Sequence, residues 1–387
     1  MKKNFKKVLV VVMALVFCVT AAVTLSACND KDNDNAFVIG MSGPLTGGAS
    51  VYGIAVQNSA QMAIEEINAL GGIQFQLKAY DDKHDASNIE SIFANMLDDG
   101  VQLTLGTVTT GPGLAFNEMA KQENMFFMTP SASANDVVKN YANGYQMCFA
   151  DNNQGQYAAE YFKTHYAGKK VGCFYNSSDT YSSGIQAQFK ANMQGVSLIE
   201  AAFTDNKAAS FDTQVNILKD CDVIFMPIYY EPASVFMLQA KDTVKASCVY
   251  FGCDGLDGIL NMGVDNIPQE ISMLTHFDSS ATTGKAGDFN KKYAEKYGRD
   301  TLNQFGASAY DCVYAIYQAM NAANITDTKI GHSELCNALC KVLNGDFVFT
   351  GAITGNDGNT AAGSKVTWDS NGYVNKSATK AIVKAAK

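Results

Sequence analysis

The sequence predicts an α/β protein of two similar lobes, each built on a mostly parallel sheet with helices on both faces. Strand-like apolar runs alternate with helical periodicity from residue 36 onward, and this alternation builds parallel sheets. The alternation restarts after residue 151, which indicates a second lobe. A chain of 387 residues that is 47% hydrophobic and 17% charged is long and apolar enough for two packed cores.

The first series begins with a strand and a helix whose apolar residues, from Val56 to Leu70, recur with a period near 3.6. Gly71 and Gly72 end that helix. Ser87 and Glu90 have the spacing of a capping box for the next helix. The strands expected in this series are 36–41, 75–80, 101–106 and 125–130.

The second series shows the same alternation of strands and helices and is followed by a helical region. We expect its helices at 154–166, 181–194, 211–219 and 232–242, and its strands at 169–176, 196–203, 222–230 and 248–252. Residues 282–343 then predict three helices. Asn371-Gly372 lies between apolar residues and predicts a hairpin turn near the C-terminus.

The N-terminus has the pattern of an export signal: a head with lysines at 2, 3, 6 and 7 precedes an apolar run, 8–25. "LSAC", which ends at Cys28, resembles the lipobox of bacterial lipoproteins. The resemblance implies that a signal peptide, 1–27, is removed and that lipid on Cys28 anchors the protein to the cell membrane through a tether, 28–35. The alternative is an uncleaved transmembrane anchor, since about 18 apolar residues can span a bilayer.

Charge and motifs exclude several classes of function. The net charge is −9, and removal of residues 1–27, with four lysines and no acids, makes it −13, which argues against nucleic-acid binding. The chain lacks the dinucleotide, P-loop, zinc-protease and nucleophile-elbow motifs, and its four histidines are scattered. We therefore expect that the protein is not an enzyme and that it binds no cofactor.

Eight cysteines remain after Cys18 in the signal and Cys28 in the lipobox are set aside. No pair has the spacing of a zinc site, so we expect no metal. We expect most of them to be buried free thiols. Cys336 and Cys340 are one helical turn apart, and a disulfide between them stays open.

Four stretches carry a resemblance to a known family: "IGMSGPLTGGASVYG", "AIEEINALGGI", "YDDKHD" and "FMTPSAS". Spaced as they are here, they resemble the type I periplasmic binding proteins that serve ABC transporters for branched-chain amino acids. The likeness covers about residues 36–380. It implies two Rossmann-like lobes with a central ligand cleft, joined by three crossovers near 148–151, 274–277 and 346–351. Lobe 1 would then hold 36–150 plus 277–346, and lobe 2 would hold 151–276 plus 347–387.

A buried amino acid needs donors for its carboxylate and a counter-charge for its ammonium group. Thr110 stands where a strand gives way to a helix in "GTVTTGPG", and a helix N-terminus suits an anion. The resemblance makes Thr110 a carboxylate-binding hydroxyl and gives Ser131 a backbone carbonyl and Ser133 a second hydroxyl. Asp254, just after a strand of the second lobe, is the expected ammonium partner. Helix capping is the alternative for Thr110, turn chemistry for Ser133 and a solvated turn for Asp254.

Aromatic side chains are expected to close over the ligand. By resemblance these are Tyr52, Tyr181 and Tyr229, each in a loop that follows a strand, although Tyr229 could exchange roles with Tyr230. Phe305 either lines the side-chain pocket or belongs to the core.

The function expected from the resemblance is capture of an amino acid, branched-chain or otherwise aliphatic, and its delivery to an ABC permease and its ATPase. We expect a monomer. Two alternatives stay open: the ligand-binding part of a membrane sensor, and a binder of amides or short peptides. Transport is favoured over sensing because no signalling segment follows the lobes in these 387 residues.

Overall fold

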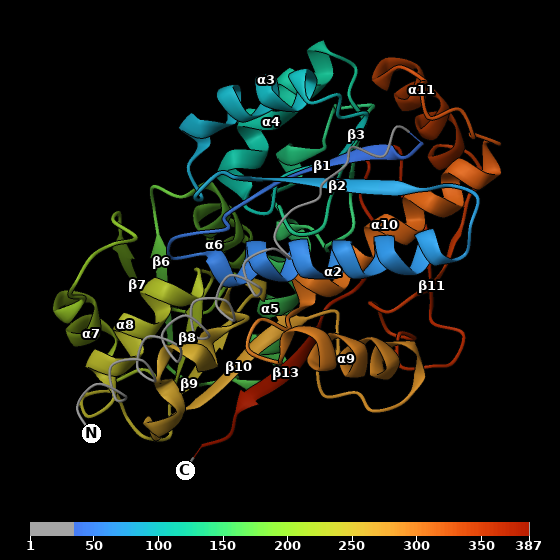
Figure 1. Cartoon of the computed structure of the whole chain (residues 1–387). Coiled ribbons are helices and arrows are strands. Elements are labelled where there is room, and N and C mark those ends of the chain that lie inside the picture. The colour runs from blue at the N-terminus through green and yellow to red at the C-terminus, as the bar shows by residue number, and fades with distance from the viewer. Residues whose placement is uncertain (1–34, 387) are drawn as a thin grey trace, which may run out of the picture. The chain divides into compact units, whose positions relative to one another are not determined.

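The computed structural model describes residues 35–386, and the chain from Ala36 onward forms one compact unit with two main sheets and a small two-stranded one (Figure 1). The predicted signal peptide, the lipidation site at Cys28 and the tether up to residue 34 lie outside the described residues. The first sheet has the order β2-β1-β3-β4-β5, and all its pairings are parallel. Its strands are β1 (Phe37–Gly43), β2 (Phe75–Asp81), β3 (Leu103–Leu105), β4 (Phe127–Thr129) and β5 (Gly144–Gln146).

The second sheet has the order β13-β10-β9-β8-β6-β7. It is parallel except for its edge strand β13, which runs antiparallel to β10. Its strands are β6 (Val171–Asn176), β7 (Leu198–Phe203), β8 (Val223–Met226), β9 (Val249–Gly252), β10 (Glu270–Thr275) and β13 (Thr379–Lys384). The two sheets confirm the predicted α/β class.

Helices cover both faces of the first sheet, with α3 and α4 on one side and α2 and α10 on the other (Figure 1). Their apolar faces form the core, in which aromatic side chains such as Phe37 and Phe116 are fully buried. The helices are α2 (Ser50–Ala69), α3 (Ile89–Asp98), α4 (Thr110–Gln122), α5 (Asp151–His165), α6 (Thr180–Asn192), α7 (Asp212–Leu218), α8 (Tyr230–Ala240), α9 (Gly284–Tyr297), α10 (Gln304–Ala322) and α11 (His332–Leu343).

Three details differ from the sequence-based expectations. The strand expected at 222–230 ends at Met226, and Tyr230 already begins α8. The capping box is wrong, because the Ser87 amide and hydroxyl both donate to Asp85 and the residue preceding α3 makes no side-chain cap. Strands β5 and β10 were not expected.

Residues 349–374 form a small satellite beside the first sheet. Here β11 (Phe349–Ala352) pairs with β12 (Ser364–Val366), and Trp368 donates its indole N–H to the carbonyl of Gln146, 2.7 Å away. The predicted Asn371-Gly372 turn is confirmed: Trp368 bridges Val374, and Gly372 has a left-handed φ of 77°. Since residues 347–387 contact both sheets, the lobe boundaries and the three crossovers stay predictions.

The eight cysteines of the described part of the chain are free thiols, and seven of them are buried. The sulfurs of Cys336 and Cys340 lie 3.8 Å apart, a hydrogen-bonding contact and not a disulfide. Within residues 35–386 no helix is long and apolar enough to cross a membrane, and no group of three or more metal-ligating side chains occurs.

Candidate functional site: an acidic, aromatic cleft between the sheets

The eight side chains predicted from the sequence converge on one pocket between the two sheets. All of them are less than a tenth exposed. The residues lining this pocket are Tyr52, Val108, Thr109, Thr110, Ser131, Ser133, Tyr181, Tyr229, Asp254, Gly255 and Phe305. The structure thus brings the whole predicted set together, from positions that span more than 250 residues of sequence.

The pocket lies beyond the carboxyl ends of strands in both sheets. In the first sheet the strand order reverses between β1 and β3, and the next helices begin there: α2 carries Tyr52, and α4 carries Thr110. In the second sheet it reverses between β6 and β8, which lead to Tyr181 and Tyr229. Open α/β sheets bind ligands at such switch points.

The first-sheet wall offers hydrogen-bond donors. Thr110 is the first residue of α4, whose first-turn N–H groups have no partner inside the helix and favour an anion. Ser131 donates its hydroxyl to the carbonyl of Val108, at 2.5 Å, and so pins the loop. The Thr110 hydroxyl accepts only a long bond, 3.4 Å, from the Ala134 amide, which leaves its proton available.

Asp254 is the one charged group that lines the pocket. Its Oδ1 accepts a hydrogen bond of 2.7 Å from the Tyr181 hydroxyl, and its backbone N–H donates to the side chain of Gln154. Its Oδ2 is buried and has no partner among the described residues. Burial raises the pKa of Asp254 to about 6, although the Tyr181 hydrogen bond opposes the rise. A cation beside Oδ2 would satisfy this oxygen and reverse that shift.

A second acid, which the sequence analysis missed, lies directly behind the residues that line the pocket. Asp151 begins α5 and is 3% exposed, and its backbone N–H donates to the carbonyl of Ser133 at 2.9 Å. Its Oδ2 also lacks a partner in the described chain. Burial and the negative charge of Asp254 raise the pKa of Asp151 well above its ordinary value. Its position after "CFA" gave no sign that this helix end would lie beside the cleft.

Aromatic rings close the pocket from both sides: Tyr181 and Tyr229 belong to the second sheet's side, and Tyr52 and Phe305 to the first sheet's side. Tyr181 and Tyr229 stack with ring centroids 4.7 Å apart, and Phe305 meets Tyr52 edge to face at 4.7 Å. Tyr52 donates its hydroxyl to the carbonyl of Gly255 at 2.6 Å and so joins the two walls. The Tyr229 hydroxyl is buried and has no hydrogen-bond partner in the part of the chain that the structure describes. Tyr230 meets Tyr52 edge to face at 5.0 Å and is not in the pocket lining, so of the two tyrosines only Tyr229 lines the pocket.

His84, one of the four histidines scattered along the sequence, is another neighbour of the pocket. Its Nδ1 lies 2.9 Å from the Thr109 hydroxyl, and its ring meets Tyr229 edge to face at 5.0 Å. Burial lowers its pKa, which favours the neutral ring. Lys83 and His84 both adopt left-handed φ angles, 56° and 60°, a strained conformation for side chains of this size. Backbone N–H groups of both residues donate to the adjacent acids of "YDD", which hold the turn.

The free volume among the side chains of the cleft is about 10 Å³, which is room for about one water molecule. The pocket is therefore closed in this structure. A larger ligand has to enter while the two walls are apart, with the contact between Tyr52 and Gly255 broken.

Comparison with known proteins places this fold and cleft in a family. A sequence profile described as periplasmic binding protein matches residues 37–363. The Leu/Ile/Val-binding protein BraC3 of Rhizobium johnstonii is 26% identical over 314 residues, which cover 79% of this chain and 82% of that protein.

Two solved structures share the fold. One is the branched-chain amino acid transporter substrate-binding protein LivJ of Streptococcus pneumoniae, in complex with isoleucine. It has a TM-score of 0.76 and 23% identity over 90% of this chain and 96% of that one. The other is an ABC-transporter solute-binding protein of Rhodopseudomonas palustris BisB5, in complex with 3,4-dihydroxybenzoic acid. It has a TM-score of 0.77 and 14% identity over 91% and 94% of the two chains. The match of the family profile to most of the chain shows that this protein belongs to the periplasmic binding proteins, a family of solute-binding proteins and not of enzymes.

Proposed function

We propose that this protein is an extracytoplasmic solute-binding lipoprotein that captures an amino acid between its two lobes and delivers it to an ABC permease and its ATPase. The amino acid is branched-chain or otherwise aliphatic. Lipid on Cys28 holds the protein at the membrane, and the protein acts as a monomer.

The observation that carries the proposal is the unpaired carboxylate oxygen of Asp254 in a buried pocket that no Lys or Arg lines. A buried anion costs several kcal/mol unless a cation meets it, and the ammonium group of an amino acid is such a cation. Opposite Asp254 stand the N-terminus of α4, Thr110 and Ser133, which suit the ligand's carboxylate. The cleft thus has an acidic end and a donor end, as a zwitterion requires.

Binding and closure follow from where these groups lie. The ligand binds first to the first-sheet wall through Thr110 and Ser133. Closure then brings Asp254, Tyr181 and Tyr229 over it, and the bond of Tyr52 to Gly255 joins the walls. The Val108 and Phe305 side chains, both buried, line the space left for an aliphatic side chain. The closed form is the one that a permease would recognise.

The relatives and neighbours favour branched-chain amino acids over aromatic acids. BraC3 of R. johnstonii is named for Leu, Ile and Val, and LivJ of S. pneumoniae was solved with isoleucine. The neighbour with 3,4-dihydroxybenzoic acid binds a ligand without an ammonium group. In this chain such a ligand would leave the charge of Asp254 unpaired.

A thermal-shift screen of the protein lacking residues 1–28 tests the proposal. The panel is the twenty amino acids with benzoate, dipeptides and amino-acid amides, and calorimetry follows any hit. A ligand at 100 times its Kd stabilises the protein by about 2.7 kcal/mol, which a melting curve resolves. We expect a shift with leucine, isoleucine or valine. Shifts confined to benzoate, amides or dipeptides would contradict the amino-acid assignment.

A further inference from the structure

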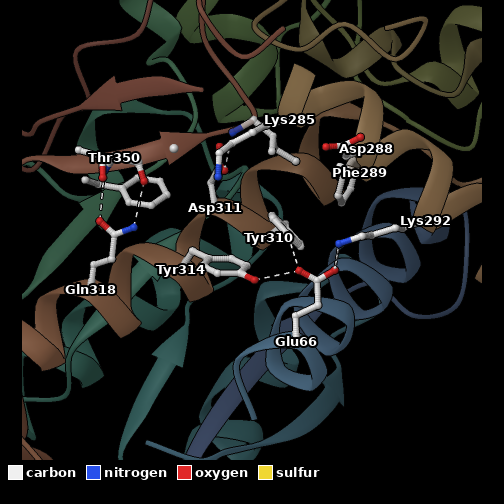
Figure 2. Close-up of a pocket in the computed structure, with 13 residues that line it drawn as sticks. Glu66, Lys285, Asp288, Phe289, Lys292, Tyr310, Asp311, Tyr314, Gln318 and Thr350 are labelled. Atoms are coloured by element: carbon white, nitrogen blue, oxygen red, sulfur yellow. Dashed lines mark hydrogen bonds and ion pairs between the residues drawn. The ribbon is translucent and has the colours of Figure 1, made fainter. Parts of the chain in front are cut away.

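A second, open pocket lies away from the cleft, among α2, α9, α10 and β11 (Figure 2). None of its lining residues lines the cleft. Its free volume is about 280 Å³, close to the lower end of the roughly 300–1,000 Å³ that small-molecule sites span. The pocket has room for a ligand of amino-acid size in the structure as it stands, whereas the closed cleft does not.

The polar groups on one side of this pocket already satisfy one another. Glu66 accepts hydrogen bonds from Tyr310 at 2.5 Å and Tyr314 at 2.8 Å, and its other oxygen pairs with the ammonium group of Lys292 at 2.7 Å. Figure 2 shows both hydroxyls directed toward that carboxylate. The three partners hold the pKa of Glu66 below its ordinary value, against the opposing effect of its partial burial. This cluster forms a fixed wall in which each charged group already has a partner.

The opposite edge carries two charges without partners. Lys285 and Asp288 come from the same turn of α9, and neither makes a hydrogen bond or ion pair through its side chain within residues 35–386. Their spacing, i and i+3, allows a helical ion pair, yet their charged atoms are more than the 4.0 Å of an ion pair apart. In Figure 2 both lie at the edge opposite Glu66. This edge presents one positive and one negative group to the pocket.

The remaining walls combine buried apolar side chains with the polar groups of Asp311, Gln318 and Thr350. Phe289, Phe349 and Ile353 are at most 3% exposed, and the rings of Phe289 and Tyr310 meet edge to face at 5.1 Å. Gln318 bonds both the N–H and the carbonyl of Thr350, which fixes β11 as one side of the pocket. Such walls suit an aromatic or large apolar group.

We propose that this pocket is a second ligand site, distinct from the cleft, for a small zwitterion with an aromatic or large apolar side chain. The ligand's carboxylate binds Lys285, its ammonium group binds Asp288, and its side chain packs on Phe289 and Phe349. The second site goes beyond the proposed transport function, because its ligand would bind whether or not the cleft is occupied.

A ligand-observed NMR titration of the full chain with L-phenylalanine tests the site. Asp254→Ala removes the acid of the cleft and should leave this binding in place. Lys285→Met and Asp288→Asn should each weaken it at least tenfold, whereas Lys291→Met, an exposed lysine of the same helix outside the pocket lining, should change it less than twofold. All three side chains are exposed, so the fold should tolerate the changes.

Two analogues separate a zwitterion site from a simpler one. 3-Phenylpropanoate lacks the ammonium group and phenethylamine lacks the carboxylate, so each should bind at least tenfold more weakly than L-phenylalanine. Equal binding of either analogue would contradict the paired role of Lys285 and Asp288. Loss of all binding in Asp254→Ala, or unchanged binding in Lys285→Met, would show that L-phenylalanine does not use this pocket.

Discussion

Asp254 is the buried residue to which we assign the ammonium group of the proposed ligand. In the free protein its burial favours the protonated acid, and its pKa rises to about 6. A ligand ammonium group favours the ionised form. Proton and ligand therefore compete for the same carboxylate.

This competition predicts that amino-acid affinity falls as the pH drops below about 6. Between pH 7.5 and pH 5 the loss should be about tenfold, since pH 5 lies one unit below the pKa of Asp254. Asp151 titrates in the same sense, because its pKa is also raised. Protonation of His84 would add to the effect of these two acids on the affinity. Calorimetry across this range, with Asp254→Asn as the control that should lose most of the dependence, checks the prediction. An affinity that is flat from pH 5 to pH 8 would show that the carboxylate is not in contact with the ligand.

His84 predicts a second effect at the scale of one side chain. Its hydrogen bond holds the Thr109 hydroxyl at the start of α4, and its ring supports Tyr229. His84→Ala should weaken amino-acid binding by about 1 kcal/mol, the net value of one hydrogen bond. Thr109→Val should cost about as much, and the double variant should cost little more, because both changes remove one contact. His165→Ala, at an exposed histidine of α5, is the control for calorimetry. Fully additive losses would mean that the two residues act independently.

At the scale of elements, the start of α3 corrects a sequence pattern. Ser87 and Glu90 have capping-box spacing, yet the carboxylate that accepts N–H and O–H bonds belongs to Asp85. A short 3₁₀ turn, Ala86–Asn88, precedes α3, and the capping residue is therefore Asp85, which lies N-terminal to Ser87.

The position of this cap predicts opposite outcomes for two substitutions. Asp85→Ala should lower the urea midpoint of unfolding, because the turn loses its acceptor. Glu90→Ala should leave the midpoint nearly unchanged, since its side chain does not close a capping box. A larger loss in Glu90→Ala than in Asp85→Ala would restore the sequence interpretation.

Segments with a clear apolar run or helical periodicity were predictable from the sequence, whereas strands β5 and β10 were not. The structure places the strands with apolar runs, and the three helices between residues 282 and 343, where the sequence pattern predicts them. Strand β5 has three residues, and β10 follows three short 3₁₀ turns that hide its start. The loop residues of the cleft were found through the family resemblance, which covers them. Asp151 and His84 were missed because their approach to the cleft depends on tertiary packing, which local pattern does not encode.

At the scale of the whole molecule, a buried cluster ties together segments that are distant in sequence. Lys376 and Asp311 lie 3.8 Å apart with side chains at most 2% exposed. Lys376 also donates to the carbonyl of Met147, just after β5, and to Thr354, while backbone N–H groups of Ile353 and Thr354 donate to Asp311. Burial lowers the pKa of Lys376 and raises that of Asp311, and their mutual attraction opposes both shifts. The cluster lies beside two of the predicted crossovers.

Removal of one member of this cluster should be costly. Lys376→Met leaves Asp311 buried and unpaired, so we expect a loss of about 3–5 kcal/mol in the free energy of unfolding. Lys380→Met removes the ammonium group of a more exposed pair with Glu270, 3.0 Å apart, and should cost at most about 1 kcal/mol. Denaturant unfolding of the two variants compares them directly. Equal stabilities would mean that Lys376 is paired too weakly to hold the segments together.

The buried carboxylate of Asp254 is proposed to meet the ammonium group of an amino acid. Calorimetric titration of leucine, isoleucine and valine into the wild type, Asp254→Ala and Asp257→Asn tests this proposal most directly. Asp257 is a neighbouring half-buried acid that accepts a bond from the Gln304 amide and does not line the cleft. We predict that Asp254→Ala weakens binding by a few kcal/mol, the scale for losing one member of a buried pair, while Asp257→Asn stays close to the wild type. Unchanged affinity in Asp254→Ala would remove this residue from the site and contradict the account.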